Sequence, residues 1–392
     1  MGETKIEWAS HTWNPISGCT KISTGCQNCY AERMSKRLAG RCGYPKDEPF
    51  KVTVHQDKFI EPLTWRKPRR VFVNSMSDLF HPDVKDDWIL AAFVAMGLTY
   101  EHTGEMKEVS PGHKTAIHKP KHIFMILTKR PERMRDFINR LVSGEPDEEW
   151  DNRANYFATQ LAGANGAILP GNAIFTVMAW IRDGMPGLWL GVSVENQAAA
   201  GERIPLLLQT PAVVRFISAE PLLSEINLSR YLKQPICKHW SRDGDPNKYG
   251  KYHWEKQSLF SADWVGIDLA ICGGESGPGA RPVHPDWVRS LRDQCQAAGT
   301  KFFFKQWGEF KEVHRYNSWP KYRDTVGRVA KAIGTTHSGR AALLNVDGSD
   351  LVNGGPDHKF FPISHLERVG KKQAGRELDG RTWDEIHEVG ES

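Results

Sequence analysis

The sequence has no apolar run that could cross a membrane, since a stretch of about 18 apolar residues occurs nowhere in the 392 positions. Its first residues, MGETKIEWASHTW, lack the apolar region of a secretory signal peptide. Cysteine is scarce, with seven in the whole chain. These absences predict a cytoplasmic protein with no membrane partner. In a reducing compartment, clustered cysteines bind metal or serve redox chemistry more often than they form disulfides.

Strong charge of either sign is also missing, because the formal net charge is only +5. An apolar share of 40% and a charged share of 25% are typical of globular domains. A mildly basic chain permits a nucleic-acid partner without requiring one. Basic clusters stand at 66–70 and 129–135, and taken alone such clusters are more often a solvated helix face or loop than a binding surface.

Two common phosphate-binding motifs are absent from the glycine-rich stretch GGESGPGARP, residues 273–282. It is neither the dinucleotide-binding pattern G-x-G-x-x-G nor a P-loop. Its glycines permit a close approach of the backbone to a ligand, and they equally suit a flexible turn from strand to helix. The sequence leaves these two interpretations open.

What the sequence does contain is a repeated alternation of short apolar runs and longer helical patterns. The runs are continuously apolar, which is typical of strands buried on both faces of a parallel sheet. Serial β-then-α units predict an α/β barrel, partial or closed and TIM-like, with a doubly wound sheet as the alternative. We expect strands at 11–18, 71–75, 123–128, 188–193, 213–218, 269–274 and 302–306, and helices at 28–39, 86–98, 131–142, 196–209, 227–232 and 284–299.

Three polar stretches interrupt this repeat, at about 101–121, 144–187 and 234–264. We interpret them as surface insertions in a barrel domain that covers residues 1–310. The chain from 311 to 392 has weak periodicity, which predicts an irregular C-terminal extension. Its segment GRELDGRTWDEIHE is a candidate to fold back onto the barrel.

Polar residues follow the expected strands at the point where each one ends. Active sites of α/β barrels lie at the carboxyl ends of the strands, so this arrangement favours a ring of functional side chains. The residues concerned are Asn74, Ser75, Ser77, Asp78, Lys129, Arg130, Glu195, Glu220, Gly273, Gly274, Glu275, Arg281 and Lys305.

Three of the cysteines, Cys19, Cys26 and Cys29, lie within the stretch SGCTKISTGCQNCYAER. A structural zinc site needs a fourth ligand, for which Cys42 or His11 is available. An iron–sulfur cluster held by three thiolates leaves one iron open to a small molecule. Chance clustering is the weakest interpretation because the loop is polar. The loop follows the first expected strand and so lies at the barrel mouth, which favours the open cluster over a peripheral zinc.

The chain resembles a family of phage and bacterial three-cysteine-motif proteins of uncharacterised function. The resemblance rests on TWNPISGCTKISTGCQNCYAERM, VFVNSMSDLFH, LTKRPERM, GVSVENQ, SAEPLL, GGESGPGARP and FFFKQWG, spread over residues 5–310. Beyond that family, the three cysteines after the first strand resemble the radical S-adenosylmethionine superfamily. That resemblance implies a [4Fe-4S] cluster and S-adenosyl-L-methionine as cofactors, with radical chemistry on a substrate in the barrel.

The same resemblance implies a role for each polar residue. The cluster would be held by Cys19, Cys26 and Cys29. Asn74, Ser75, Ser77 and Asp78 would hold the methionine part of the cofactor, Glu195 or Glu220 a ribose hydroxyl, and Gly273, Gly274 and Glu275 would lie against it. Lys129, Glu220 and Lys305 are the expected catalytic residues, and Lys129, Arg130, Arg281 and Lys305 would face an anionic substrate, a nucleotide or nucleic acid, with a partner protein as a further possibility.

The alternative from another class is a non-catalytic nucleic-acid-binding module that carries zinc or an iron–sulfur cluster. It accounts for the basic clusters and for the 14 tryptophans, which could stack on bases. It does not account for polar residues at the end of every expected strand. Iron with sulfide would support the enzyme, and one tightly held zinc would support the module.

Overall fold

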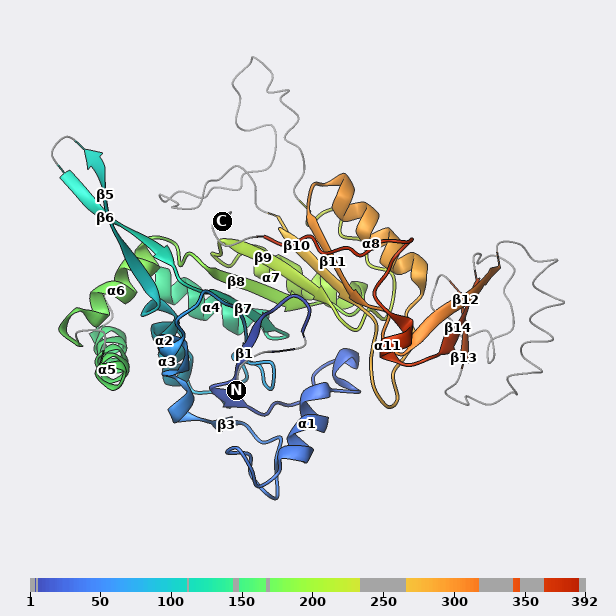
Figure 1. Cartoon of the computed structure of the whole chain (residues 1–392), viewed down its shortest axis with the longest axis horizontal. Helices are drawn as coiled ribbons and strands as arrows, with labels where there is room; N and C mark the ends of the chain where they lie inside the picture. Colours follow the sequence, from blue (N-terminus) through green and yellow to red (C-terminus); the bar gives the residue numbers. More distant parts are fainter. Residues whose placement is uncertain are drawn as a thin grey trace, which may run out of the picture.

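The structure is a computed structural model, and it describes residues 4, 6–110, 113–143, 148–166, 170–232, 266–316, 341–345 and 363–387. Its centre is a seven-stranded parallel sheet in which the strands lie side by side in chain order (Figure 1). The strands are β1 (His11–Trp13), β4 (Arg70–Val73), β7 (Ile123–Thr128), β8 (Leu188–Ser193), β9 (Val214–Ala219), β10 (Leu269–Gly273) and β11 (Lys301–Gln306).

Each strand pairs in parallel with the next, from His11 opposite Val71 at one edge to Leu269 opposite Lys301 at the other. Within the described ranges β1 and β11 do not pair with each other, so the sheet is a half-barrel that does not close. The prediction of an α/β fold with a partial barrel is confirmed, and closure is not seen. The helices that connect or precede strands are α1 (Tyr30–Leu38), α3 (Asp86–Gly97), α4 (Pro131–Val142), α7 (Gln197–Leu208) and α8 (Pro285–Ala297).

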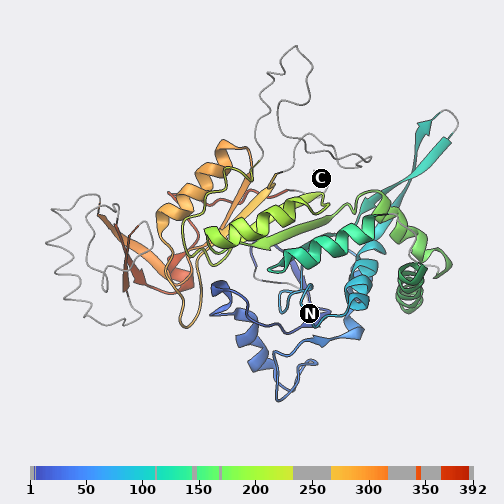
Figure 2. The ribbon, with the colours of Figure 1, turned by 180° about the vertical axis from the view of Figure 1, so that it is seen from behind.

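The two faces of the sheet are buried by different partners, as β7 shows. Phe124 and Ile126 join the large core shared with the helices, and α4 and α7 lie in front of the sheet when it is seen from behind (Figure 2). Ile123 and Met125 point to the other face, where they pack with Trp8 and with other strand residues. Both faces are apolar because both are covered, which explains the continuous apolar runs in the sequence.

The stretch 144–187 is not merely a surface insertion. It contains α5 (Glu148–Asn165) and α6 (Pro170–Arg182), which pack against α3 and against each other. Their buried Trp150, Ala158 and Trp180 belong to the main core. A side chain at Gly97 of α3 would meet the Trp180 ring at 3.0 Å, so α6 lies close against α3.

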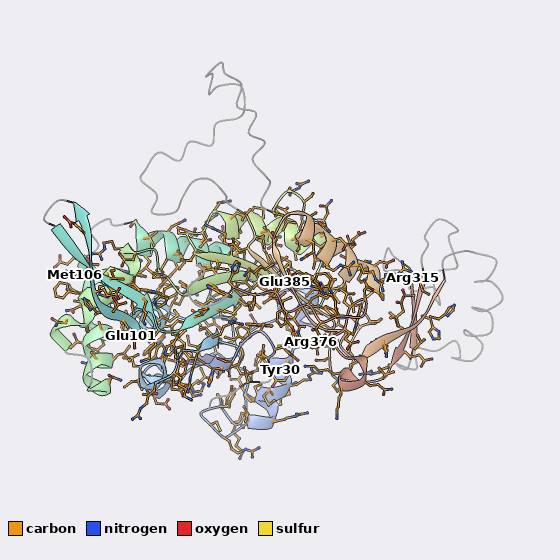
Figure 3. All side chains as sticks on the ribbon, turned by 45° about the horizontal axis from the view of Figure 1, so that its top comes forward. Tyr30, Glu101, Met106, Arg315, Arg376 and Glu385 are labelled. Carbon is orange, nitrogen blue, oxygen red and sulfur yellow. The ribbon has the colours of Figure 1, made fainter. Side chains whose placement is uncertain are left out.

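The other two expected insertions differ from each other. The described residues of 101–120 belong to the antiparallel pair of β5 (Tyr100–Ser110) and β6 (His113–Pro120), which projects from the body of the molecule (Figures 1 and 3). The stretch 234–264 lies outside the described residues. Of the helices described, none is long and apolar enough to cross a membrane.

The helix expected at 227–232 is not formed. The Asn227 side chain accepts hydrogen bonds from the backbone N–H and hydroxyl of Ser229, and this local pairing makes a turn. Asparagine and serine compete with helical hydrogen bonds in this way, which is why they favour turns.

The strand expected at 11–18 divides in two. His11–Trp13 form β1 of the central sheet, and Ile16–Ser17 form β2, which pairs antiparallel with Thr53–Val54 outside that sheet. Pro15 stands between the two and has no N–H to donate to a strand ladder. The other expected helices and strands are present, with ends shifted by a few residues.

The extension after residue 310 is not irregular where it is described. Strands β12 (Phe310–Tyr316), β14 (Ile363–Arg368) and β13 (Ala341–Asn345) form an antiparallel sheet in that order, and α11 (Lys371–Ala374) follows. The final segment folds back as expected. Trp383 is buried against Phe302, and its carbonyl oxygen accepts a 2.9 Å bond from the Phe304 N–H, which covers the edge of β11.

Candidate functional site

A cavity of about 300 Å³ lies at the carboxyl ends of the strands, between the sheet and the loop that carries the three cysteines. Phe72 and Leu127 contribute apolar surface to it, and both pack on the face of the sheet opposite the helices. The sequence-predicted residues that line it are Cys19, Cys26, Cys29, Asn74, Ser75, Ser77, Asp78, Lys129, Arg130, Glu220, Gly274, Glu275 and Lys305. Glu195, Gly273 and Arg281 do not line it.

The cysteine loop is shaped by backbone contacts at its start and by helices at its end. The short strands β2 (Ile16–Ser17) and β3 (Thr53–Val54) pair just before it. Gly18 has a φ of 87°, and a Cβ there would lie 2.1 Å from the Lys51 carbonyl oxygen, so only glycine permits this approach. The loop then forms the 3-10 turn η1 (Thr24–Cys26), and Cys29 caps the N-terminus of α1.

The environments of two thiols differ although both face the same cavity. Burial and the Asp78 carboxylate raise the pKa of Cys19 to about 11, against the opposing charge of Arg130. Burial also acts on Cys26, but a hydrogen bond from the Ile22 backbone and the charge of Lys129 outweigh it and hold its pKa below the usual value. The cavity wall therefore favours the neutral thiol at Cys19 and the thiolate at Cys26.

No three His, Cys, Asp or Glu side chains in the described ranges lie close enough together to hold a single metal ion. A cubane cluster makes a different demand, because each thiolate binds a different iron and the thiolates stand apart around it. Three cysteines from one loop that all face one cavity match that donor set. Cys42 is exposed and does not line the cavity. The residues present therefore fit a three-thiolate cluster.

Asp78 links two strand ends to the cysteine loop. Its Oδ1 accepts a 2.7 Å hydrogen bond from the Thr128 hydroxyl, and its Oδ2 accepts one of 3.1 Å from the Lys129 backbone. The Arg130 guanidinium lies 2.8 Å from Oδ2 and also donates to the Cys19 thiol at 3.6 Å. Its other terminal nitrogen donates to the Thr20 carbonyl at 3.2 Å. Asp78 and Arg130 thus hold the loop and have few bonds left for a ligand.

Asn74 has hydrogen-bonding capacity to spare. It follows β4 in the left-handed region, with a φ of 57°, and it is 3% exposed. Neither its side-chain oxygen nor its nitrogen has a hydrogen-bond partner among the residues that the structure describes. Its neighbours do have partners, since Ser75 donates to the Asn14 side chain and Ser77 donates to the Ile16 carbonyl. A buried amide without a partner is costly, so Asn74 is the group in this segment suited to bind a ligand.

Glu195 lies behind the cavity wall and not on it. Its Oε2 accepts a 2.9 Å bond from Arg203, and the Lys129 ammonium is 3.9 Å away. Burial opposes ionisation, but the charges of Lys129 and Arg203 keep the pKa of Glu195 below its usual value. A Cβ at Gly25 would lie 3.0 Å from the Glu195 carboxyl carbon. The Glu195 side chain, held by Arg203, therefore packs directly against the cysteine loop at Gly25.

Glu220 and Lys305 form the ion pair on the opposite side of the cavity, 3.0 Å apart. A Cβ at Gly273 would lie 2.7 Å from Oε1 of Glu220, so this glycine makes room for the carboxylate and does not touch the cavity. Gly274 is required for a different contact, because a Cβ there would meet the Trp307 carbonyl oxygen at 2.0 Å. Gln306 lines this side, and its buried oxygen Oε1 has no hydrogen-bond partner within the described part of the chain.

Glu275 binds Arg281 through both oxygens, at 2.9 and 2.8 Å. Burial raises the pKa of Glu275, but the hydrogen bonds from Arg281 and Asn28 outweigh it and hold the pKa below its usual value. Arg281 is thereby held at the glycine-rich loop and does not line the cavity, so a contact with substrate stays a prediction. The basic stretch at 66–70 precedes and begins β4, at the end opposite Asn74, as expected.

Sequence reasoning missed several residues that shape the site. Asn28 lies inside the Cys26–Cys29 spacing and binds Glu275, so its position between two cysteines could have drawn attention to it. Arg203 on α7 carries no local signal, because only the packing of α7 on the sheet brings it to Glu195. Gln306 ends an apolar strand, as the chosen residues do, so the strand-end rule identifies it, but the sequence offers no reason to assign it a role.

Comparisons with known proteins complete the picture. No curated protein and no solved structure matches the chain. A family model described as "Protein of unknown function (DUF5131)" matches residues 3–106 and 112–387. Because the match covers nearly the whole length, the chain belongs to this family.

Proposed function

We propose that the protein is a radical S-adenosylmethionine-type enzyme that holds a [4Fe-4S] cluster on Cys19, Cys26 and Cys29. The observation that carries the proposal is the convergence of three thiols from one loop and of polar groups from several strand ends on one cavity. A cavity of about 300 Å³ is at the lower end of the range for ligand sites. When bound, the cluster and S-adenosyl-L-methionine would supply one-electron cleavage of the sulfonium and hydrogen abstraction from a substrate.

The chain's own residues bind and orient the ligand in this proposal. The free carboxamide of Asn74 offers both a donor and an acceptor to the amino and carboxylate ends of the cofactor. Ser75, Ser77 and Asp78 shape the same segment through bonds within the protein. Glu220 lies on the cavity wall and can accept a hydrogen bond from a ribose hydroxyl. Glu195 does not line the cavity and can affect the ligand only through the charge of Lys129, 3.9 Å away. Phe72 and Leu127 exclude water from one side.

Proton handling falls to Lys129, Glu220 and Lys305. The Lys305 ammonium and the Glu220 carboxylate are 3.0 Å apart on the cavity wall, so a proton can be held or passed between Nζ and Oε1. Lys129 presents a second ammonium from the neighbouring side. We include these three residues as the catalytic groups of the proposed enzyme.

The substrate in this proposal is a nucleotide or nucleic acid. Its support is narrower than the sequence implied, because Arg130 and Arg281 are held by Asp78 and Glu275. The cavity cation with the loosest carboxylate partner is Lys129, whose ammonium lies 3.9 Å from Glu195. Lys305 lies 3.0 Å from Glu220, so it would exchange part of that ion pair for a phosphate group. A lysine binds phosphate as a point charge and does not need the planar fork of arginine.

The test is anaerobic reconstitution of the full chain with iron and sulfide, followed by reduction in the presence of S-adenosyl-L-methionine. We expect bound iron and sulfide, a cubane signal by electron paramagnetic resonance, and release of 5′-deoxyadenosine and methionine. Cys19→Ser, Cys26→Ser and Cys29→Ser should each abolish all three results. The matched control is Cys42→Ser, which changes an exposed thiol outside the cavity and leaves them intact.

One result would replace the proposal with the alternative. If the purified protein holds one tightly bound zinc, takes up no iron–sulfur cluster and does not cleave S-adenosyl-L-methionine, the non-catalytic metal-binding module is the better description.

A further inference from the structure

We propose that Glu275 is a positioning residue that fixes the segment between Cys26 and Cys29 from across the cavity mouth. The proposal concerns the glycine-rich loop at 273–282 and its contacts with the cysteine loop. The positioning of the cysteine loop can be measured in the metal-free protein. Only the effect of Glu275 on the stability of a bound cluster rests on the proposed function.

The first step is the set of bonds on the Glu275 carboxylate. Oε2 accepts from the Asn28 side chain at 3.0 Å, from the Arg281 backbone at 2.8 Å and from Arg281 Nε at 2.9 Å, and Oε1 accepts from Arg281 Nη2 at 2.8 Å. The carboxylate side chain is only 6% exposed. Charge-assisted bonds in such a setting are among the stronger hydrogen bonds of a protein. Glu275 therefore connects its own loop firmly to Asn28.

The second step is where the partners lie. Asn28 and Gln27 are the two residues between Cys26 and Cys29. Asn28 donates to the Gly279 carbonyl at 2.7 Å as well as to Glu275, and Arg281 donates to the Gln27 side chain at 3.3 Å. Both residues between the thiols are thus held by the glycine-rich loop. Cys19 is held separately, by Arg130 on the other side of the cavity.

The third step explains the glycines. Arg33 on α1 donates to the Ser276 carbonyl at 3.0 Å, and a Cβ at Gly277 would lie 2.3 Å from its guanidinium. A Cβ at Gly279 would lie 3.0 Å from the Asn28 side-chain oxygen. Both glycines have positive φ values, of 93° and 75°. The loop is therefore built to receive the cysteine segment and α1 at close range.

The fourth step is the support behind the loop. The Gly277 N–H donates to Glu309 at 2.8 Å, and Arg368 of β14 donates to the Gly277 carbonyl at 2.8 Å. The backbone of Glu309 also donates to the Glu275 carbonyl at 3.1 Å. The loop runs between α1 on one side and the C-terminal sheet with α11 on the other (Figures 1 and 2). The C-terminal extension thus holds the loop that holds the cysteines.

The experiment measures alkylation of each thiol by iodoacetamide in the reduced, metal-free full chain, resolved by mass spectrometry. Glu275→Gln keeps the shape but loses one acceptor oxygen, and Asn28→Ala removes the contact from the cysteine side without burying an unpaired charge. We expect each variant to raise alkylation of Cys26 and Cys29 by about tenfold, the size expected for loss of a charge-assisted bond, with Cys19 unchanged. Glu275→Asp, which keeps both oxygens, should restore much of the protection.

The matched control is Asp379→Asn, which weakens a comparable arginine pair with Arg289 and Arg292 away from the cysteine loop. Asparagine tolerates the φ of 52° at that position, so the backbone is unaffected. Unchanged alkylation of Cys26 and Cys29 in both Glu275→Gln and Asn28→Ala overturns the positioning role. Faster alkylation in a protein whose wild type takes up no iron–sulfur cluster keeps the positioning role and rejects the proposed function. In a protein that does bind a cluster, both variants shorten its lifetime against a chelator.

Discussion

Arg130 bridges Asp78 and Cys19, with the same guanidinium nitrogen 2.8 Å from the carboxylate and 3.6 Å from the thiol. Both side chains of the ion pair are nearly buried, with 11% and 8% of their surface exposed. The pair ties the end of β4, the start of α4 and the cysteine loop into one unit. Removal of either Asp78 or Arg130 should therefore loosen the packing of β4, α4 and the cysteine loop.

We expect Arg130→Ala to lower the free energy of unfolding by about 2–4 kcal/mol, because it leaves the Asp78 carboxylate buried without its cation. Urea unfolding followed by circular dichroism measures this. Arg135→Ala, on the same helix but paired with the largely exposed Asp136, should change stability by less than about 1 kcal/mol. Equal decreases in the free energy of unfolding for the two variants would show that the buried pair with Asp78 stabilises the fold no more than an exposed pair does.

We expect Gly273→Ala to push Glu220 away from Lys305, because the added Cβ would lie 2.7 Å from the carboxylate oxygen. Overpacking of this kind costs about 1–3 kcal/mol of stability, and in the proposed enzyme it should also reduce turnover. Gly201→Ala, in a helix with open space at its Cβ position, is the control and should be neutral or slightly stabilising. A crystal structure of Gly273→Ala with the ion pair intact would contradict the expectation.

If the substrate carries phosphate, binding to a short single-stranded DNA or RNA should weaken as salt rises, because phosphate contacts release counterions. Lys129→Ala and Lys305→Ala should each reduce the slope of log affinity against log salt by about 1. Lys67→Ala changes an exposed cation at the far end of β4 and should leave the slope unaltered. Fluorescence anisotropy across a salt series measures all three, and salt-independent binding would point to a small metabolite instead.

His122 gives a prediction for pH. It is 1% exposed, between the rings of Trp65 and Phe124, and burial with the charge of Lys121 lowers its pKa to about 4. The unfolded chain takes up this proton near pH 6.5, so the unfolded state binds more protons between that pH and about 4. The free energy of unfolding should therefore fall as the pH is lowered from 6.5 to about 4, and His122 should contribute about 3 kcal/mol to this decrease.

Replacement of the imidazole by a ring of similar size isolates that contribution. His122→Phe should flatten the pH dependence between about 6.5 and 4, in urea unfolding at fixed temperature. Phe175→Leu, at an exposed position of α6, changes no titratable group and is the control. An identical pH profile in wild type and His122→Phe would show that the buried imidazole is protonated without penalty.

The amino-acid pattern by itself determined the sheet. Continuous apolar runs such as 123–128 and 188–193 became strands covered on both faces, because a parallel sheet between two apolar layers needs apolar side chains on both. The order of strands followed from the series of β-then-α units, since each crossover places the next strand beside the last. The gathering of Cys19, Asp78, Lys129 and Lys305 at one cavity followed from the same rule, because parallel strands end at the same edge.

Only the tertiary structure decided which of those residues are free to meet a ligand. Arg281 and Asn74 are both polar and follow strand ends, yet Arg281 is bound by Glu275, whereas the Asn74 side chain has no partner in the described ranges. Asn28 meets Glu275 from 247 positions away in the chain, and Arg203 meets Glu195 from the following helix. Tertiary packing alone brings these side chains together, so the sequence does not show that they pair. Burial makes each such pairing obligatory, because an ionised group away from water is stable only with a partner of opposite charge or with hydrogen-bond donors.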